Sequence, residues 1–207
     1  MKKILNVDEL QKSRWPQIFQ DIFEDNLVSA FTHGDCLMEG FSALQNSWNI
    51  SFILKEATPT FLKKLKDKVP EAKRENIQFL HFFCLDEISE LQKTFPLEFL
   101  HISKKNLVLC GSQPFKDFVP DPSALQQECR RKLQGIALTL RQNFLYTKEK
   151  KIASTQELLP ILYGLYFLNH GSYPQNNQTV LAPCTKKLNS IEGVLELVDL
   201  LLTSDPQ

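Results

Sequence analysis

Leu27–Glu56, with the sequence LVSAFTHGDCLMEGFSALQNSWNISFILKE, decides the fold that we expect for this chain. The apolar segments at its two ends, Leu27–Thr32 and Trp48–Lys55, are rich in Val, Ile and Phe and are too brief for ordinary helices. Between them we expect a turn at Gly34 and then a short helix or loop over Cys36–Leu44. The pattern therefore predicts two buried, neighbouring strands at the centre of the fold.

The rest of the first 120 residues is expected to complete this pair into a sheet covered by helices. Ile77–Leu85 is apolar throughout, which is typical of a central strand buried on both faces, and Phe95–Ile102 and Leu107–Gly111 are predicted as two further strands. In the first helix Asp8 is the candidate N-cap, and Pro16 either kinks the helix or marks its true first turn. The predicted helices are Val7–Glu24, Thr58–Lys68 and Asp86–Gln92.

A change of composition at Gln113–Pro122, which contains three prolines, predicts a linker. Beyond it, apolar residues recur every three or four positions from Leu125 to Phe144, and Asp121 and Ser123 are candidate N-caps of this long helix. Three further helices are predicted over Ser154–His170, Asn176–Cys184 and Ser190–Thr203. The sequence thus predicts an α+β fold with two domains, residues 1–120 around a mixed β-sheet and residues 121–207 as an all-α helical domain.

The composition bounds the class of protein. Lys plus Arg equals Asp plus Glu at 24 each, so no overall charge attracts nucleic acid, and a nucleic-acid partner is not expected. The five cysteines are odd in number and have no C-x-x-C spacing, which favours free thiols in a reducing, cytoplasmic compartment. Because no apolar run approaches the roughly twenty residues of a membrane span, we expect no membrane association through a transmembrane helix.

Several short motifs occur in an order that resembles a known family. Gly34-Asp35 closes the first predicted strand, and Asn46-Ser47-Trp48-Asn49 opens the second. Pro96–Leu100 reads PLEFL, and Leu140–Leu145 reads LRQNFL at the end of the long helix. This arrangement resembles the nucleotidyltransferase superfamily, in particular a bacterial subgroup with a PLEFL strand. The resemblance implies a nucleotidyltransferase-like mixed β-sheet flanked by helices, followed by an all-α C-terminal bundle.

The resemblance also implies where Mg²⁺ and a nucleoside triphosphate would bind. In the family a Gly-Ser turn contacts phosphate, and two carboxylates two residues apart on the second strand hold the metal ion. Gly34, Ser47 and Asn49 stand at corresponding positions here and are the candidate cofactor-binding residues. Ser47 and Asn49 share a face if the strand is regular. Both are neutral, however, and Mg²⁺ prefers charged oxygen ligands because it gives up its water reluctantly.

Other polar residues are candidates with open alternatives. Glu98, an acidic residue in a predicted apolar strand, is the candidate metal ligand, but it could instead form a structural ion pair or face water. Asp35 and Glu98 are the candidate catalytic residues, because they would have to replace the missing carboxylates. Arg130 and Arg141 are candidate phosphate ligands, or else solvated or locally paired charges. His81 is predicted to be a hydrogen-bonded core histidine.

Two functions follow from these residues. The first is a nucleotidyltransferase-like protein with impaired catalysis that serves as a binding module for a nucleotide, a protein or another copy of itself. The second is an active Mg²⁺-dependent nucleotidyltransferase, which would transfer a nucleotidyl group from a nucleoside triphosphate to an acceptor. The sequence favours the first, because the paired carboxylates that would hold the ion are replaced by neutral side chains.

Overall fold

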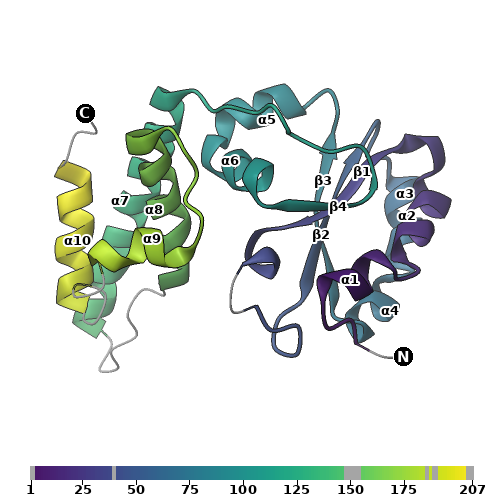
Figure 1. Ribbon diagram of the computed structural model, residues 1–207, viewed down its shortest axis with the longest axis horizontal. Coiled ribbons are helices and arrows are strands. Elements are labelled where there is room, and N and C mark those ends of the chain that lie inside the picture. Colours follow the sequence, from purple (N-terminus) through teal and green to yellow (C-terminus); the bar gives the residue numbers. More distant parts are fainter. Residues whose placement is uncertain (1–2, 39–40, 147–154, 185–186, 188–190, 204–207) are drawn as a thin grey trace. The chain divides into compact units, whose positions relative to one another are not determined.

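The computed structural model describes residues 3–38, 41–146, 155–184, 187 and 191–203 (Figure 1). The chain divides into two compact units. The first consists of Met1–Gln92 and His101–Phe118, and the second of Lys93–Leu100 and Val119–Gln207. The structure is of mixed α+β content, with a four-stranded sheet and flanking helices in the first unit and a helical C-terminal region in the second. In the described residues, no helix combines the length and apolarity that crossing a membrane requires.

The sheet of the first unit is mixed and has the strand order β3-β2-β1-β4. Strand β1 is antiparallel to both β2 and β4, whereas β2 and β3 are parallel. The predicted pair of neighbouring strands is confirmed, because Phe31 in β1 lies opposite Ser51 in β2. The strand that was expected to be central, β3, lies at an edge of the sheet, so that expectation is wrong. The strands are β1 Leu27–His33, β2 Trp48–Leu54, β3 Ile77–Cys84 and β4 Asn106–Gly111.

Four helices pack on one face of this sheet and enclose the larger core of the unit (Figure 1). The aromatic rings of α2 interlock with rings from the strands: Phe19 and Phe52 meet edge to face with centroids 5.0 Å apart. The segment predicted as one helix from Val7 forms two. Pro16 lies in the first turn of the second, and Asn6 rather than Asp8 caps the first, through the Glu9 N–H. The helices are α1 Val7–Gln11, α2 Trp15–Phe23, α3 Pro59–Lys66 and α4 Val69–Arg74.

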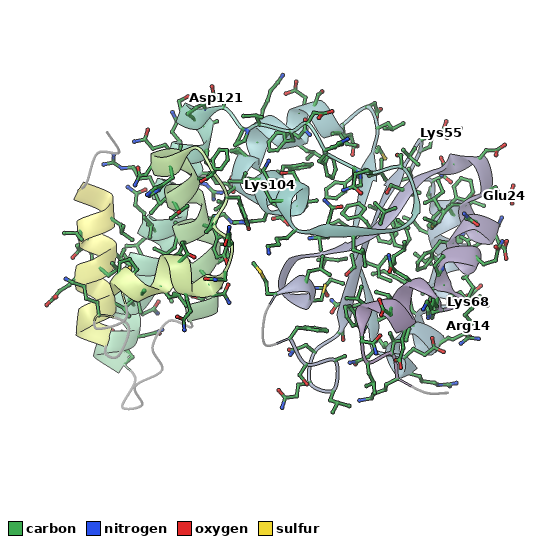
Figure 2. All side chains as sticks on the ribbon, viewed as in Figure 1. Arg14, Glu24, Lys55, Lys68, Lys104 and Asp121 are labelled. Carbon is green, nitrogen blue, oxygen red and sulfur yellow. The ribbon has the colours of Figure 1, made fainter. Side chains whose placement is uncertain are left out.

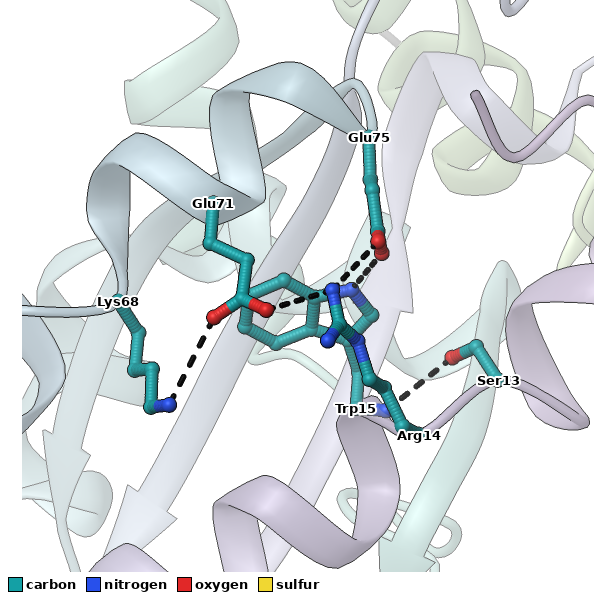
Figure 3. Close-up of polar contacts among 6 residues, drawn as sticks. All are labelled: Ser13, Arg14, Trp15, Lys68, Glu71 and Glu75. Carbon is teal, nitrogen blue, oxygen red and sulfur yellow. Dashed lines mark hydrogen bonds and ion pairs between the residues drawn. The ribbon is translucent and has the colours of Figure 1, made fainter. Parts of the chain in front are cut away.

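A buried carboxylate ties α2 to the end of α4 (Figure 3). Glu75, only 7% exposed, accepts a hydrogen bond of 2.6 Å from the Trp15 indole N–H and one of 2.7 Å from Arg14. Arg14 also pairs with Glu71 at 2.6 Å, and Glu71 lies 3.6 Å from Lys68. Because one Glu75 oxygen satisfies a fully buried indole and the other meets a guanidinium, this charge is compensated inside the fold.

The opposite face of the sheet carries a smaller core, to which α5 Ile88–Thr94 and α6 Pro96–Lys104 each contribute a residue. Phe31, Ile53 and Ile102 are its buried members. The segment from Phe95 to Ile102 was expected to be a strand and is mostly the helix α6, so that prediction is wrong. The strand predicted to end at Gly111 is confirmed as β4.

The predicted helical C-terminal region is confirmed: its described residues form four helices and one short 3-10 turn. Asp121 accepts the Ala124 N–H at 2.8 Å at the start of α7. The carboxylate of Glu128, buried in α7, accepts the Leu97 N–H at 2.7 Å and so joins the start of α6 to this unit. Ser154, the first residue of a predicted helix, lies outside the described residues. The elements are α7 Pro122–Tyr146, α8 Thr155–His170, α9 Asn177–Leu181, η3 Ala182–Cys184 and α10 Ile191–Thr203.

Candidate functional site

The second face of the sheet has an apolar end and a polar end. Phe31 and Ile53 lie at the apolar end. Side chains alternate between the faces of a strand, so His33 shares the face of Phe31, and Asn49 shares the face of Ser51. The polar end lies where β1 finishes and where β2 and β4 begin. We define it by eight positions on the four strands and their ends: His33, Gly34, Asn49, Ser51, Gln78, His81, Lys105 and Asn106.

Ser51 bridges two histidines from the neighbouring strands. Its hydroxyl lies 2.9 Å from His33 Nε2 and 3.4 Å from His81 Nδ1, and it accepts the backbone N–H of His81 at 3.3 Å. The two imidazole rings are stacked with their centroids 5.6 Å apart. Ser51 is fully buried, whereas His81 is partly exposed. The bonds between His81 and Ser51 agree with the prediction that His81 is hydrogen-bonded. Because His81 is partly exposed, its ring lies at the surface of the polar end.

His33 is held in its neutral form. It is 6% exposed, and burial lowers its pKa from 6.5 to about 4, with His81 nearby as the second cause. A neutral imidazole carries one N–H and one acceptor nitrogen, so His33 and Ser51 can form their hydrogen bond without a buried charge. At neutral pH this cluster therefore supplies hydrogen-bonding groups and no net charge from His33.

Gly34 turns the chain at the end of β1, and its backbone lies beside the backbone of Lys105. Its φ of 79° lies in the left-handed region that favours glycine, and a methyl group added there would meet no atom within 4 Å. The Gly34 N–H donates to the carbonyl oxygen of Lys105 at 3.4 Å. Lys104, labelled in Figure 2, ends α6 immediately before Lys105 and β4. Two cationic residues thus adjoin the predicted turn.

Asn76 positions the start of β2. Its carbonyl oxygen accepts the Trp48 N–H at 2.7 Å, and its side-chain amide donates to the carbonyl oxygens of Ala43 and Asn46. Asn76 has a φ of 69°, a conformation that asparagine tolerates better than most residues. These bonds anchor the loop that leads into Ser47, and Ser47 itself is partly exposed.

The candidate residues do not all lie in one unit. Gly34 and Asn49 lie in the first unit at the polar end of the sheet, and Ser47 directly precedes β2 in the same unit. Asp35 follows Gly34 in the 3-10 turn η2, Gly34–Leu37, and its side chain is outside what the structure describes. Glu98 is a partly buried residue of α6 in the second unit, on a helix and not on the predicted strand.

The two candidate arginines belong to α7 of the second unit. Arg130 is exposed. Arg141 pairs with Asp199 of α10 at 3.1 Å, and both side chains are more than half exposed. Local pairing was the alternative that the sequence left open for Arg141, and the structure provides such a partner.

The donor atoms at the polar end do not fit a magnesium clamp. Mg²⁺ is held in proteins by carboxylates, phosphates and water in octahedral geometry, whereas positions 47 and 49 offer a neutral hydroxyl and a neutral amide. Within the described part of the chain, no three His, Cys, Asp or Glu side chains gather where they could hold a metal ion.

Sequence reasoning missed five members of the polar end: His33, Ser51, Gln78, Lys105 and Asn106. Two of them carried a usable signal, because Ser51 stands two residues after Asn49 and His33 stands directly before the turn glycine. Lys105 and Asn106 carried none, since their place beside His33 depends on the β1–β4 register. No protein-family model matches the sequence, and comparison with curated proteins finds no significant match.

Proposed function

We propose that this chain is a nucleotidyltransferase-like protein that has lost efficient transfer chemistry and serves as a nucleotide-binding module. In this proposal the polar end of the sheet holds the phosphate-bearing part of the ligand. The observation that carries the proposal is the composition of that end: none of its eight positions is acidic, one is a lysine, and Gly34 turns the chain where β1 ends. Asp35 follows Gly34 in the 3-10 turn and is the acidic residue next to these positions.

The electrostatics favour an anion that arrives without a metal ion. Two carboxylates at positions 47 and 49 would repel a triphosphate unless a cation lay between them. Ser47 and Asn49 remove that repulsion and still offer hydrogen bonds to phosphate or ribose oxygens. Lys105 and the partly exposed His81 add donors to the same end, and lysine is a common phosphate ligand.

Isothermal titration calorimetry with ATP and CTP, each with and without Mg²⁺, tests this proposal. We expect binding in the micromolar to millimolar range that does not require Mg²⁺. Lys105→Ala should weaken it by roughly three- to tenfold, since one charge-assisted contact is lost. Lys66→Ala is the matched control, because Lys66 is an exposed lysine of α3 away from the polar end. No heat change at millimolar nucleotide would rule out nucleotide binding.

A gain-of-function variant tests the family relationship separately. Ser47→Asp with Asn49→Asp rebuilds the two carboxylates of the family pattern. In this double variant, nucleotide binding should become dependent on Mg²⁺, because the new charges repel the phosphates until a cation joins them. If wild-type binding already needs Mg²⁺ and is lost in Glu98→Gln, that result would favour the alternative of an active Mg²⁺-dependent nucleotidyltransferase.

A further inference from the structure

Strand β3 forms one edge of the sheet and has an unusual composition for that place. Its eight residues, Ile77–Cys84, contain no Lys, Arg, Asp, Glu or Pro. In the described chain, β2 is the strand that pairs with it, and no strand pairs with its other side. Natural edge strands are usually short or carry charges, prolines or bulges that discourage pairing with another chain. β3 is irregular at Leu80 and His81, because Ile50 of β2 pairs with Phe79 and Phe52 pairs with Phe82, but it has neither a charged residue nor a proline. The uncharged edge on both sides of that irregularity is therefore suited to pairing.

Apolar side chains along this edge reach the surface. Leu80 is 37% exposed and Leu85, directly after the strand, is 48% exposed. Phe82 and Phe83 are partly exposed on opposite faces, since Phe82 stacks on Phe52 of the larger core and Phe83 packs in the smaller core. A strand added at this edge would cover apolar groups on both faces of the sheet.

The charges that flank β3 identify a second copy of this chain as the occupant. Lys73 and Arg74 come shortly before the strand, and Asp86 and Glu87 come shortly after it; all four are exposed. The nearby Glu75 is buried and already bonded to Arg14 and Trp15. In an antiparallel pair of identical strands, the basic flank of each copy lies beside the acidic flank of the other. A parallel pair would place like charges together.

The other edge strand lacks this self-complementarity. β4 is preceded by Lys104 and Lys105, but Ser112 and Gln113 follow it and carry no charge. Two copies of β4 in antiparallel contact would gain no opposite-charge pairs next to the strand. The charge pattern therefore distinguishes β3 from β4.

We propose that two copies of this chain pair antiparallel through β3 across a two-fold axis, which joins their sheets into one of eight strands. Such an isologous contact brings the same surface of both copies together and closes after two. With the two strands centred on each other, Leu80 lies next to the axis. Gln78 and His81 of β3 also belong to the polar end, but the dimer and nucleotide binding are measured by different experiments, so each proposal can fail without the other.

The first test is the mass of the full chain in solution. Sedimentation equilibrium and light scattering over a concentration series should give a dimer that dissociates on dilution. Leu80→Lys should weaken the dimer at least tenfold, because it removes two apolar side chains from the contact and brings two like charges close to the two-fold axis. Leu138→Lys is the control, since Leu138 of α7 is 66% exposed and lies in the second unit. A wild-type chain that stays monomeric at about 100 µM would overturn the proposal.

A charge-exchange experiment tests the antiparallel arrangement itself. One variant carries Lys73→Glu with Arg74→Glu, and the other carries Asp86→Lys with Glu87→Lys. Each alone places like charges at both ends of the contact and should dimerise about tenfold more weakly than wild type. Mixed together, they should form heterodimers, since every flank then meets the opposite charge, and native mass spectrometry distinguishes the species. Unchanged homodimers of either variant would contradict the proposal. Circular dichroism confirms that each variant is folded.

Discussion

His33 is a residue through which the stability of the sheet unit depends on pH. Its folded pKa of about 4 lies below the unfolded value of 6.5, so the unfolded chain binds the proton more readily. The stability that neutral His33 contributes is therefore complete above pH 6.5 and is lost as the pH falls towards 4. Between about pH 7 and pH 5 we expect the free energy of unfolding to drop by roughly 2 kcal/mol from this residue.

Urea unfolding across this pH range measures the effect. In His33→Gln the amide can still bond to Ser51 but does not titrate, so the wild type should lose more stability than the variant as the pH falls. The difference between the two curves isolates His33 from the carboxylates that titrate lower. Equal pH dependence in both proteins would show that His33 is not held neutral.

Two glycines with positive φ should respond differently to the same substitution. At Gly111, with a φ of 89°, an added methyl group would collide with the Val28 carbonyl and approach Ser29 Cα at 2.9 Å. Gly34 has a similar φ and open space around it. We expect Gly111→Ala to lower the free energy of unfolding by about 2–4 kcal/mol and Gly34→Ala by about 1 kcal/mol. Thermal unfolding of the two variants side by side compares them, and similar losses would contradict the collision.

At the scale of single residues, the sequence could identify positions whose signal is local. Gly34 stands out as a turn residue, and Asn49 follows from the period of two along a strand. The link between Ser51 and His81 could not be read in this way, because it depends on how two separate strands align. The register between β2 and β3 is irregular between Ile50 and Phe52, and no local sequence pattern predicts this irregularity.

At the scale of elements, α6 is the largest difference between expectation and structure. Leu97, Phe99, Leu100 and Ile102 are all buried, so the helix is apolar on more than one side. Glu98, His101 and Lys104 recur every three residues in this helix, but a short apolar run around them looks much the same in a buried helix and a buried strand. The proline at its first position, Pro96, is the local feature compatible with a helix start. The pair β1 and β2 was predictable because it is short, β-branched and bounded by turn residues.

The link between α2 and α4 should depend on one carboxylate. Glu75→Ala would leave the buried Trp15 N–H without its acceptor and remove the partner of Arg14. We expect the free energy of unfolding to fall by about 2–4 kcal/mol, measured by urea denaturation. Lys68→Ala removes only the outermost member of the same network, at 3.6 Å from Glu71, and should change it by less than about 0.5 kcal/mol. A small effect of Glu75→Ala would mean that the network is not needed for this packing.

At the scale of the whole molecule, one segment of the chain leaves the sheet unit and forms part of the helical unit. Lys93–Leu100 belongs to the helical unit although the chain on both sides of it belongs to the sheet unit. It contributes buried Leu97, Phe99 and Leu100, and its Leu97 N–H is accepted by Glu128. The packing there is close: a methyl group on Gly164 of α8 would lie 2.5 Å from Leu97 Cδ1. The helical unit therefore depends on residues that precede the linker.

Two fragments that differ only in this segment test the dependence. A fragment of residues 93–207 should unfold cooperatively in urea, whereas a fragment of residues 101–207 should unfold at a lower urea concentration. The reason is the loss of three buried apolar side chains, each worth about 1.5–3 kcal/mol on burial. Far-ultraviolet circular dichroism follows both transitions. Coincident transitions would indicate that the helices of the second unit are complete without the segment.

The segment Lys93–Leu100 also affects the order in which the chain folds during translation. Because Lys93–Leu100 emerges before β4, the sheet can be finished while Leu97, Phe99 and Leu100 still await α7 and α8, whose residues extend to His170. At about 5–20 residues per second, this interval lasts several seconds. During that time an apolar segment of the nascent chain is exposed to solvent. Exposed apolar segments of this kind are bound by chaperones during translation.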